Sequence, residues 1–372
     1  MSLLPTLLAL LLMNGARALK SCKDCTRIDQ CEPAFQLVTT DKSATTASLL
    51  KNALCGHDGL PKVCCSDFTM SRTLIQNENT DEPATTPEPE VENHPNINLL
   101  SGECGDVEGN RIVGGVTTSL YEFPWLALIG YKVENTVVYN CGGTVINSRY
   151  VLTAAHCVYG KNKTLASVRI GDYDISSKVD CTGEGEDQEC ESTYQEIGIS
   201  QTIYHQDYVR SLFQVKNDIA LLRLTNPVDF SLRNAAPICL PVTKQLLEMD
   251  INGERGVVAG WGVTETGKKS NILLKVEVPI YSLSTCNSLY HRDRRARQSK
   301  FENVFCAGDR GSDSCKGDSG GPLMLEGPYR DTYKLIQFGV VSFGSSQCGS
   351  SIPGVYTDVR KFMKWILNNI KP

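Results

Sequence analysis

Short apolar runs separated by polar and glycine-rich turns mark the chain from about residue 112 to its end. Each run holds four to eight residues, which is typical of β-strands, whereas a helix usually needs about ten or more. The runs lie at residues 125–130, 150–155, 219–224, 257–260, 273–278 and 336–343. This pattern predicts an all-β barrel or sandwich. Residues 112–372 amount to 261 positions, which is enough for two small barrels.

One segment near the C-terminus shows helical spacing instead. Apolar residues recur there every three or four positions and so form one face of a helix. They are Val359, Phe362, Met363, Ile366 and Ile370. We therefore expect a C-terminal helix over residues 359–370.

The N-terminus has the pattern of an export signal. Residues 3–13 are apolar apart from Pro5 and Thr6, and a small-x-small cleavage site follows at residues 16–18. The run is too short to span a bilayer, which takes about 20 residues. A buried core helix is the alternative, but cysteines follow the run rather than a helical pattern. We expect a signal peptide over residues 1–18 and a secreted, extracellular protein.

The chain contains 16 cysteines, an even number that favours secretion because reducing compartments do not preserve so many disulfides. Six of the cysteines fall within residues 22–65. A segment this short cannot bury enough apolar surface alone, so bridges must stabilise it. Six cysteines allow 15 pairings, among which spacing cannot choose. Half a zinc site at Cys22 and Cys25 is the alternative reading.

Residues 66–111 differ in composition from both flanking regions. Nine acidic residues and no basic one lie between Arg72 and Arg111, and prolines interrupt the segment at 83, 87, 89 and 95. We expect a solvated acidic linker that ends in an activation segment. The net charge of the chain is −5, which disfavours a large nucleic-acid-binding surface. The basic stretch at residues 291–300 is then a solvated loop by default, or an exosite for an acidic partner.

Three short segments carry residues suited to nucleophilic catalysis. Serine catalysis needs a base beside the hydroxyl and a carboxylate that orients the base. His156 follows an apolar run and precedes a cysteine, Asp218 opens another apolar run, and Ser319 lies in the glycine-rich sequence GDSGGP. The order His, Asp, Ser at these separations is a stronger signal than any one segment.

These segments resemble the chymotrypsin-like serine proteases, and the resemblance extends over residues 112–372. The matching motifs are IVGG (112–115), TAAHC (153–157), NDIAL (217–221), GWG (260–262), GDSGGP (317–322) and PGVY (353–356). Residues 22–65, which end in a Cys-Cys pair, resemble a clip domain. The whole chain is similar to the arthropod clip-domain serine proteases.

The resemblance implies two perpendicular six-stranded antiparallel β-barrels with a C-terminal helix, preceded by a small disulfide-rich clip domain. In the cleft between the barrels, His156 would be the general base and Asp218 would orient it, with Ser342 beside Asp218. Ser319 would be the nucleophile. The backbone N–H groups of Gly317 and Ser319 would form the oxyanion hole.

Trypsin-like specificity is also implied. Asp313 stands where the family has the floor of the pocket for arginine or lysine, and Ser314 adds a hydroxyl beside it. Gly344 and Gly354 would leave the pocket walls open. Activation would require one cut between Arg111 and Ile112, after which the new α-ammonium of Ile112 would pair with Asp318.

The family pattern also assigns the cysteines. The implied pairs are Cys22–Cys64, Cys25–Cys55, Cys31–Cys65, Cys104–Cys239, Cys141–Cys157, Cys181–Cys190, Cys286–Cys306 and Cys315–Cys348. The pair Cys104–Cys239 would tie the light chain to the protease domain after activation.

Two further sites are suggested on the surface. Asp172, Asp174, Ser177 and Asp180 lie in one loop-like stretch, and clip proteases bind calcium in a similar loop with hard oxygen ligands. The alternative is an acidic surface loop. Asn162 begins the sequon Asn-Lys-Thr, which predicts N-glycosylation in a secreted chain.

The sequence thus predicts a secreted trypsin-like serine endopeptidase zymogen of an innate-immune cascade, either melanisation or the Toll pathway. Catalysis should need no cofactor, and Ca²⁺ would be structural. Expected partners are an upstream trypsin-like activating protease, a downstream protein zymogen or cytokine precursor, and a serpin inhibitor, with neither nucleic acid nor membrane. The first alternative is a catalytically inert homologue that acts as a binding cofactor or scaffold. A digestive trypsin is a further alternative, although digestive enzymes do not usually carry a clip module.

Overall fold

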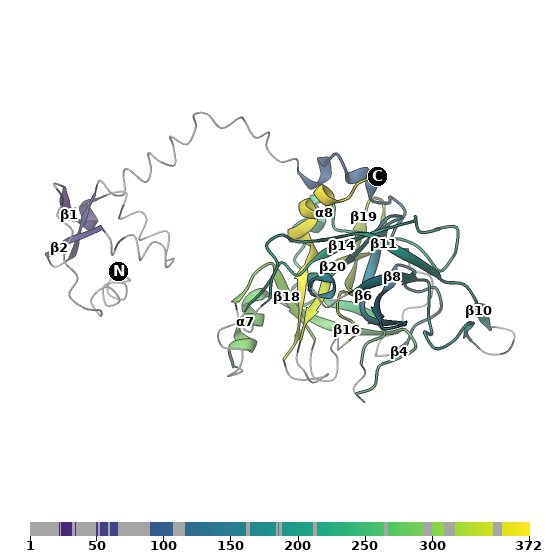
Figure 1. Cartoon of the computed structure of the whole chain (residues 1–372). Helices are drawn as coiled ribbons and strands as arrows, with labels where there is room; N and C mark the ends of the chain where they lie inside the picture. The colour runs from purple at the N-terminus through teal and green to yellow at the C-terminus, as the bar shows by residue number, and fades with distance from the viewer. Residues whose placement is uncertain are drawn as a thin grey trace. The chain divides into compact units, whose positions relative to one another are not determined.

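The chain divides into two units, residues 1–88 and 89–372, in the computed structural model (Figure 1). Each unit is described by itself. The structure describes residues 22, 24–31, 34, 50, 53–58, 60–65, 90–106, 116–160, 164–183, 185, 188–210, 214–263, 267–292, 300–308, 317–344 and 352–372. None of the helices in these ranges is both long and apolar enough to cross a lipid bilayer.

The first unit contains a three-stranded antiparallel sheet in the order β1-β3-β2. Its elements are β1 (Cys25–Arg27), the 3₁₀ helix η1 (Ile28–Gln30), β2 (Leu54–Asp58) and β3 (Leu60–Cys64). The buried apolar cluster of its described residues is small, with Ile28, Leu50 and Val63 as its largest members. Three disulfides compensate for the small size of this apolar cluster: Cys22–Cys64, Cys25–Cys55 and Cys31–Cys65. Each closes a loop of 30 to 42 residues, worth roughly 2–4 kcal/mol.

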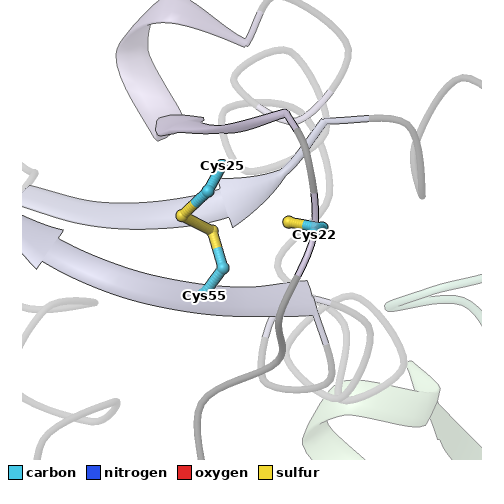
Figure 2. Close-up of side chains that lie close together, drawn as sticks. All are labelled: Cys22, Cys25 and Cys55. Carbon is cyan, nitrogen blue, oxygen red and sulfur yellow. A yellow bond between two sulfur atoms is a disulfide. The ribbon is translucent and has the colours of Figure 1, made fainter.

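The sulfur atoms of Cys22, Cys25 and Cys55 lie within 4.8 Å of one another, as a zinc site would require (Figure 2). The Cys25 and Cys55 sulfurs are bonded to each other, however, and the Cys22 sulfur is bonded to Cys64. Zinc binds cysteine as the thiolate, which a disulfide cannot provide. The zinc alternative therefore does not hold for this cluster.

In the second unit, six antiparallel strands close into a first barrel in the order β11-β14-β7-β6-β5-β8. The strands are β5 (Leu126–Val133), β6 (Thr136–Asn147), β7 (Tyr150–Thr153), β8 (Leu165–Ile170), β11 (Gln195–Tyr204) and β14 (Ala220–Leu224). The first six residues of β5 and all four of β7 are buried, which is why their sequences read as nearly unbroken apolar runs. Closure of the sheet leaves no edge strand unpaired.

A second barrel forms from a sheet in the order β15-β19-β20-β21-β18-β16-β4, which a β15–β16 pairing closes. The strands are β4 (Val116–Thr117), β15 (Arg255–Gly260), β16 (Leu274–Tyr281), β18 (Val304–Ala307), β19 (Pro322–Tyr329), β20 (Thr332–Phe343) and β21 (Gly354–Asp358). Strand β4 pairs outside the closed ring, along β16. The predicted pair of six-stranded antiparallel barrels is therefore confirmed.

Smaller elements decorate the barrels. They are α5 (Ala155–Val158), β9 (Asp180–Thr182), β10 (Glu189–Glu191), β12 (Val209–Arg210), β13 (Gln214–Lys216), α6 (Lys244–Leu247), α7 (Leu283–Arg292) and β17 (Lys300–Phe301). The hairpin β9–β10 places Cys181 opposite Cys190, and these two residues form a disulfide. Helix α7 includes the backbone of His291, in a stretch whose composition favoured a loop.

The chain ends in the 3₁₀ helix η5 (Val359–Phe362) and helix α8 (Met363–Asn369), as the spacing of apolar residues predicts. Val359, Phe362, Met363, Ile366 and Ile370 are all buried. The predicted apolar face is thus the face that packs on the core.

Residues 90–106 pack on the barrels of the second unit, although their composition predicted a solvated linker. They contain the 3₁₀ helices η2 (Val91–Asn93) and η3 (Ile97–Leu99), and Val91, His94 and Leu100 are buried. The Asn96 side chain donates to the carbonyl oxygens of Leu367 and Ile370 at the end of α8. A short apolar and hydrogen-bonded segment thus follows the acidic stretch, and the Cys104–Cys239 disulfide fastens it.

Candidate active site

The paired strands β7 and β14 bring His156 and Asp218 together. In their antiparallel register Thr153 is opposite Ala220, so the residues just after β7 and just before β14 share one end of the barrel. His156 lies in the single turn of α5, and its Nδ1 is 2.7 Å from Asp218 Oδ2. The backbone N–H of His156 also donates to Asp218 Oδ1 at 2.8 Å. Two contacts to one carboxylate leave the imidazole little freedom to rotate.

The second barrel completes the surroundings of Asp218. The Ser342 hydroxyl, on β20, donates to Asp218 Oδ2 at 2.5 Å, and the Thr357 hydroxyl, on β21, donates to the Asp218 carbonyl at 2.9 Å. Asp218 is only 2% exposed. Burial by itself would raise the pKa of its carboxyl, but the His156 imidazole and the hydrogen bonds from His156 and Ser342 outweigh it and hold the pKa below its ordinary value. The carboxylate therefore stays ionised beside the imidazole.

Ser319 lies in the turn that leads into β19, across from His156. Its carbonyl oxygen accepts from Gly142 N–H at 2.8 Å, and Gly320 N–H donates to the Val341 carbonyl at 2.8 Å. Cys157 Sγ lies 3.6 Å from the Ser319 carbonyl oxygen and 3.7 Å from His156 Nε2. The Cys141–Cys157 disulfide thus adjoins both residues, and the Cys157 sulfur lies between the serine backbone and the imidazole.

The glycines around Ser319 are required by space and by backbone conformation. A Cβ at position 320 would stand 2.2 Å from the Thr153 hydroxyl, and φ there is +83°. Gly317 has φ +109°, also in the region that side chains disfavour. Positive φ angles at Gly317 and Gly320 thus shape the backbone on both sides of Ser319 into a tight turn that side chains other than glycine disfavour.

Asp318 is inserted between two other glycines. The N–H of Gly262 donates to Asp318 Oδ1 at 2.8 Å. A Cβ at position 260 would lie 2.3 Å from Oδ1, and one at position 262 would lie 2.2 Å from Oδ2. The motif Gly260-Trp261-Gly262 therefore forms a clamp for this carboxylate, and we call these three residues the glycine clamp.

Other residues named from the sequence fall in two groups. Gly344 directly follows β20 and Gly354 begins the neighbouring strand β21, so both lie at the same end of one strand pair. Arg111, Ile112, Asn162, Asp313, Ser314 and the pair Cys315–Cys348 lie outside the described residues. The structure contains the other seven implied disulfides, which also include Cys286–Cys306.

The acidic loop, Asp172 to Asp180, contains the carboxylates of Asp172, Asp174 and Asp180, whose oxygens do not all lie within 4.8 Å of one another. Asp172 accepts a hydrogen bond from Arg169 at 2.9 Å, and Asp180 Oδ2 accepts from Tyr173 N–H at 2.9 Å. Burial raises the pKa of Asp172; the pairing with Arg169 opposes this, and the nearby Asp180 and Asp174 add to it. Asp180 Oδ1 is buried and has no hydrogen-bond partner within the described part of the chain. This orphan oxygen is the feature of the loop that suits a hard cation, whose other ligands would include carbonyl oxygens and water.

Sequence reasoning missed Lys269, which lies next to the Ser319 turn. Its Nζ donates to the Tyr139 carbonyl oxygen, and its Cε is 3.6 Å from where a Cβ would stand on Gly317. In sequence it belongs to a polar turn with Lys268 and resembles any solvated lysine. Only the tertiary structure shows that its side chain lies beside Gly317.

Comparisons with known proteins agree with this geometry. A family model described as "Trypsin" matches residues 112–366, and one described as "Regulatory CLIP domain of proteinases" matches residues 24–65. The chain is 37% identical over 360 residues to CLIP domain-containing serine protease HP8 of Bombyx mori, covering 94% of this chain and 91% of that protein. It is 37% identical over 365 residues to Melanization protease 1 of Drosophila melanogaster, covering 93% and 90%.

A solved structure is similar over a comparable length. The crystal structure of the Drosophila Grass clip serine protease of the Toll pathway aligns with a TM-score of 0.61 and 32% identity, covering 92% of this chain and 91% of that one. The family model for the catalytic unit spans most of the chain, and the relatives align along nearly their whole length. The chain therefore belongs to the clip-domain serine proteases, a family of trypsin-like serine endopeptidases.

Proposed function

We propose that this protein is a secreted serine protease zymogen that, once cut, cleaves other proteins after arginine or lysine in an extracellular cascade. The observation that carries the proposal is the buried, ionised Asp218 bonded to His156 Nδ1, with the Cys157 sulfur in contact with both His156 and Ser319. This is the arrangement that serine nucleophiles need.

In the proposed reaction, His156 Nε2 takes the proton of the Ser319 hydroxyl as Oγ attacks the scissile carbonyl. The carbonyl electron pair moves to oxygen, where the N–H groups of Gly317 and Ser319 stabilise it; one such donor is worth about 2.7–4 kcal/mol. The imidazolium then gives its proton to the leaving amine, and water releases the acyl group by the same steps. Asp218 keeps Nδ1 protonated throughout and stabilises the imidazolium, and Ser342 keeps Asp218 ionised.

Activation would follow a cut between Arg111 and Ile112. The freed α-ammonium of Ile112 has an ordinary pKa of about 7.7–8.0. Pairing with the Asp318 carboxylate raises that pKa, so the pair persists at neutral pH and is lost as pH rises well above about 8. Asp318 is flanked by Gly317 and Ser319, so its position governs both oxyanion donors. The basic residue before the cut implies a trypsin-like activator.

Specificity for arginine or lysine would come from Asp313 and Ser314 at the base of the pocket. A buried, unpaired carboxylate favours a cationic side chain strongly. Gly344 and Gly354, at one end of β20 and β21, contribute no side chain at these two positions. Both features support a pocket that admits a long basic side chain.

The cascade role rests on the relatives. Their names include a melanization protease, a phenoloxidase-activating factor of Holotrichia diomphalia and a Spaetzle-processing enzyme of Drosophila melanogaster. We infer that this chain likewise acts between an upstream protease and a downstream zymogen or cytokine precursor, under control of a serpin. Residues 1–18 would direct secretion, and Asn162 would be glycosylated.

We also propose a structural calcium ion in the acidic loop. Asp180, through its buried orphan oxygen, and Asp174 would be ligands, with the Ser177 carbonyl beside them. Asp172 would contribute the oxygen that Arg169 leaves open. The ion would supply positive charge that offsets repulsion among these carboxylates, and catalysis would not pass through it.

Reaction with a fluorophosphonate probe tests the function against the alternative of an inert scaffold. Protein cut at Arg111 should be labelled at Ser319 and should hydrolyse arginine peptides. The Ser319→Ala variant is the control for labelling, and uncut Arg111→Gln protein is the control for activation. A cut wild type that takes no label would make the scaffold alternative the better one.

A further inference from the structure

Tyr173, in the acidic loop, is a buried meeting point of hydrogen bonds from distant parts of the chain. Its hydroxyl donates to the Thr118 carbonyl at 2.7 Å, and its carbonyl accepts from the Leu273 N–H at 3.0 Å. The same carbonyl accepts from the indole N–H of Trp261 at 3.0 Å. Asp180 fixes the Tyr173 backbone from the other side. Tyr173 is therefore held at its backbone N–H, its carbonyl and its side chain.

Two hydrogen-bond partners of Tyr173 are related to the proposed activation ion pair between Ile112 and Asp318. Trp261 is related to Asp318, and Thr118 is related to Ile112. Trp261 is the central residue of the glycine clamp, whose flanking glycines enclose the Asp318 carboxylate. Thr118 directly follows β4 (Val116–Thr117) and stands six residues after Ile112, the residue that the proposed cut would free. The Thr118 N–H and hydroxyl both donate to the Leu273 carbonyl, so this residue is fixed as well.

We propose that Tyr173 and Trp261 are positioning residues for the oxyanion hole, because they hold the glycine clamp around Asp318 and Thr118, which follows the activation cut, on one buried anchor. The inference rests on the proposed function, in which the Ile112–Asp318 pair orders Gly317 and Ser319. Trp261 is only 4% exposed and Tyr173 only 7%, so the bond between them lies out of water. A buried bond of this kind is directional and costly to leave unmade.

In this proposal, the anchor sets the distance between the Asp318 carboxylate and the Ile112 ammonium. If the Trp261 indole loses its acceptor, the peptide groups of Gly260 and Gly262 can rotate, and the Asp318 carboxylate moves with them. The ammonium of Ile112 then gains less from pairing, and its pKa falls back toward that of a free α-amino group. The Lys269 ammonium also interacts with the Asp318 carboxylate. None of the variants below changes Lys269, so its charge is the same in every protein compared.

The experiment compares two buried tryptophans in full-length protein cut at Arg111. Trp261→Phe keeps an aromatic ring and removes the N–H that Tyr173 accepts. Trp125→Phe is the matched control, because Trp125 is fully buried and its N–H lies 3.2 Å from Met324 Sδ, away from Asp318. We expect Trp261→Phe to lower kcat on an arginine peptide roughly three- to tenfold. The alkaline limit of activity should also move to lower pH. Trp125→Phe should lower Tm and leave both quantities unchanged.

A second variant covers the case in which Trp261→Phe fails to fold. Tyr173→Phe removes only the hydroxyl that holds Thr118, and it too should move the alkaline limit to lower pH with little change in KM. Unchanged kcat and alkaline limit in the folded variants would overturn the proposal, as would equal loss of kcat in Trp125→Phe. If cut wild type takes no fluorophosphonate, the proposed function fails and this inference with it; an active wild type with unaffected variants rejects the inference alone.

Discussion

Substitution of Gly262 by alanine should disable the catalytic centre without unfolding the domain. The added methyl group would lie 2.2 Å from Asp318 Oδ2 and 2.4 Å from its Cγ, closer than Cβ atoms come to other atoms in real proteins. The backbone itself is not at fault, because Gly262 does not have a positive φ. The conflict is therefore between the new methyl group and the Asp318 carboxylate.

The magnitude follows from the two ways in which the clash can be relieved. If the carboxylate stays, overpacking costs about 1–3 kcal/mol. If it moves away, it loses the hydrogen bond from Gly262 N–H, and a bond to a charged group is worth about 1.5–3 kcal/mol. The cheaper response thus costs about 1–3 kcal/mol, which corresponds to a roughly 5- to 150-fold loss of the ordered, active population.

The assay is the initial rate on an arginine peptide after complete cleavage at Arg111, normalised to correctly folded protein. Gly253→Ala serves as the control, because Gly253 has φ +85° and no atom within 4 Å of an added Cβ. That variant should lose about 1–2 kcal/mol of stability from backbone strain and keep its kcat. A Gly262→Ala enzyme with a rate within twofold of the wild type would refute the reasoning about the glycine clamp.

Three further predictions concern stability. Ser342→Ala removes a hydrogen bond to the buried Asp218 carboxylate, so it should cost about 1.5–3 kcal/mol at pH 7. Because the folded-state pKa of Asp218 is lowered, the stability that its carboxylate contributes is present above about pH 4 and is lost below it. Urea unfolding should therefore show that Ser342→Ala lowers the free energy of unfolding less at pH 3 than at pH 7. An equal loss at the two pH values would contradict this. Asn96→Ala removes two hydrogen bonds to the end of α8 and should lower the free energy of unfolding by about 1–3 kcal/mol. Hydrogen exchange of α8, followed by mass spectrometry, should become faster. Unaltered exchange would mean that Asn96 does not hold the helix. Calcium at about 100 times its Kd should add about 2.7 kcal/mol to the wild type, seen as a higher Tm that a chelator reverses, and nothing to Asp180→Asn; a wild-type Tm insensitive to calcium would remove the proposed ion.

Local sequence was enough to predict six of the strands, the C-terminal helix and the segments that carry the chemistry. All six apolar runs correspond to strands, because a buried strand needs an unbroken apolar run and that run is visible in a short window. The C-terminal helix is visible for the same reason, since its apolar face recurs every three or four residues. His156, Asp218 and Ser319 stand out because each lies in a short motif of unusual composition.

Residues 90–106 were misread because composition is an average. The acidic and proline-rich residues before position 90 dominate the composition of the whole segment. Residues 90–106 nevertheless make a few apolar and polar contacts that hold them on the protease unit. Val91 and Leu100 pack in its core, and Asn147 donates to the Leu99 carbonyl. No sequence window shows where these residues dock, because their partners lie far along the chain.

The tertiary structure alone decided which distant residues meet. The bond between His156 and Asp218 spans 62 positions, and the bond between Trp261 and Tyr173 spans 88. Both exist because closed barrels force strands from far apart in sequence into register, whereas a window of sequence reports only neighbours along the chain. The sequence by itself thus determined the chemical groups of this protease, and closure of its two barrels determined their distances, their burial and the ionisation of Asp218.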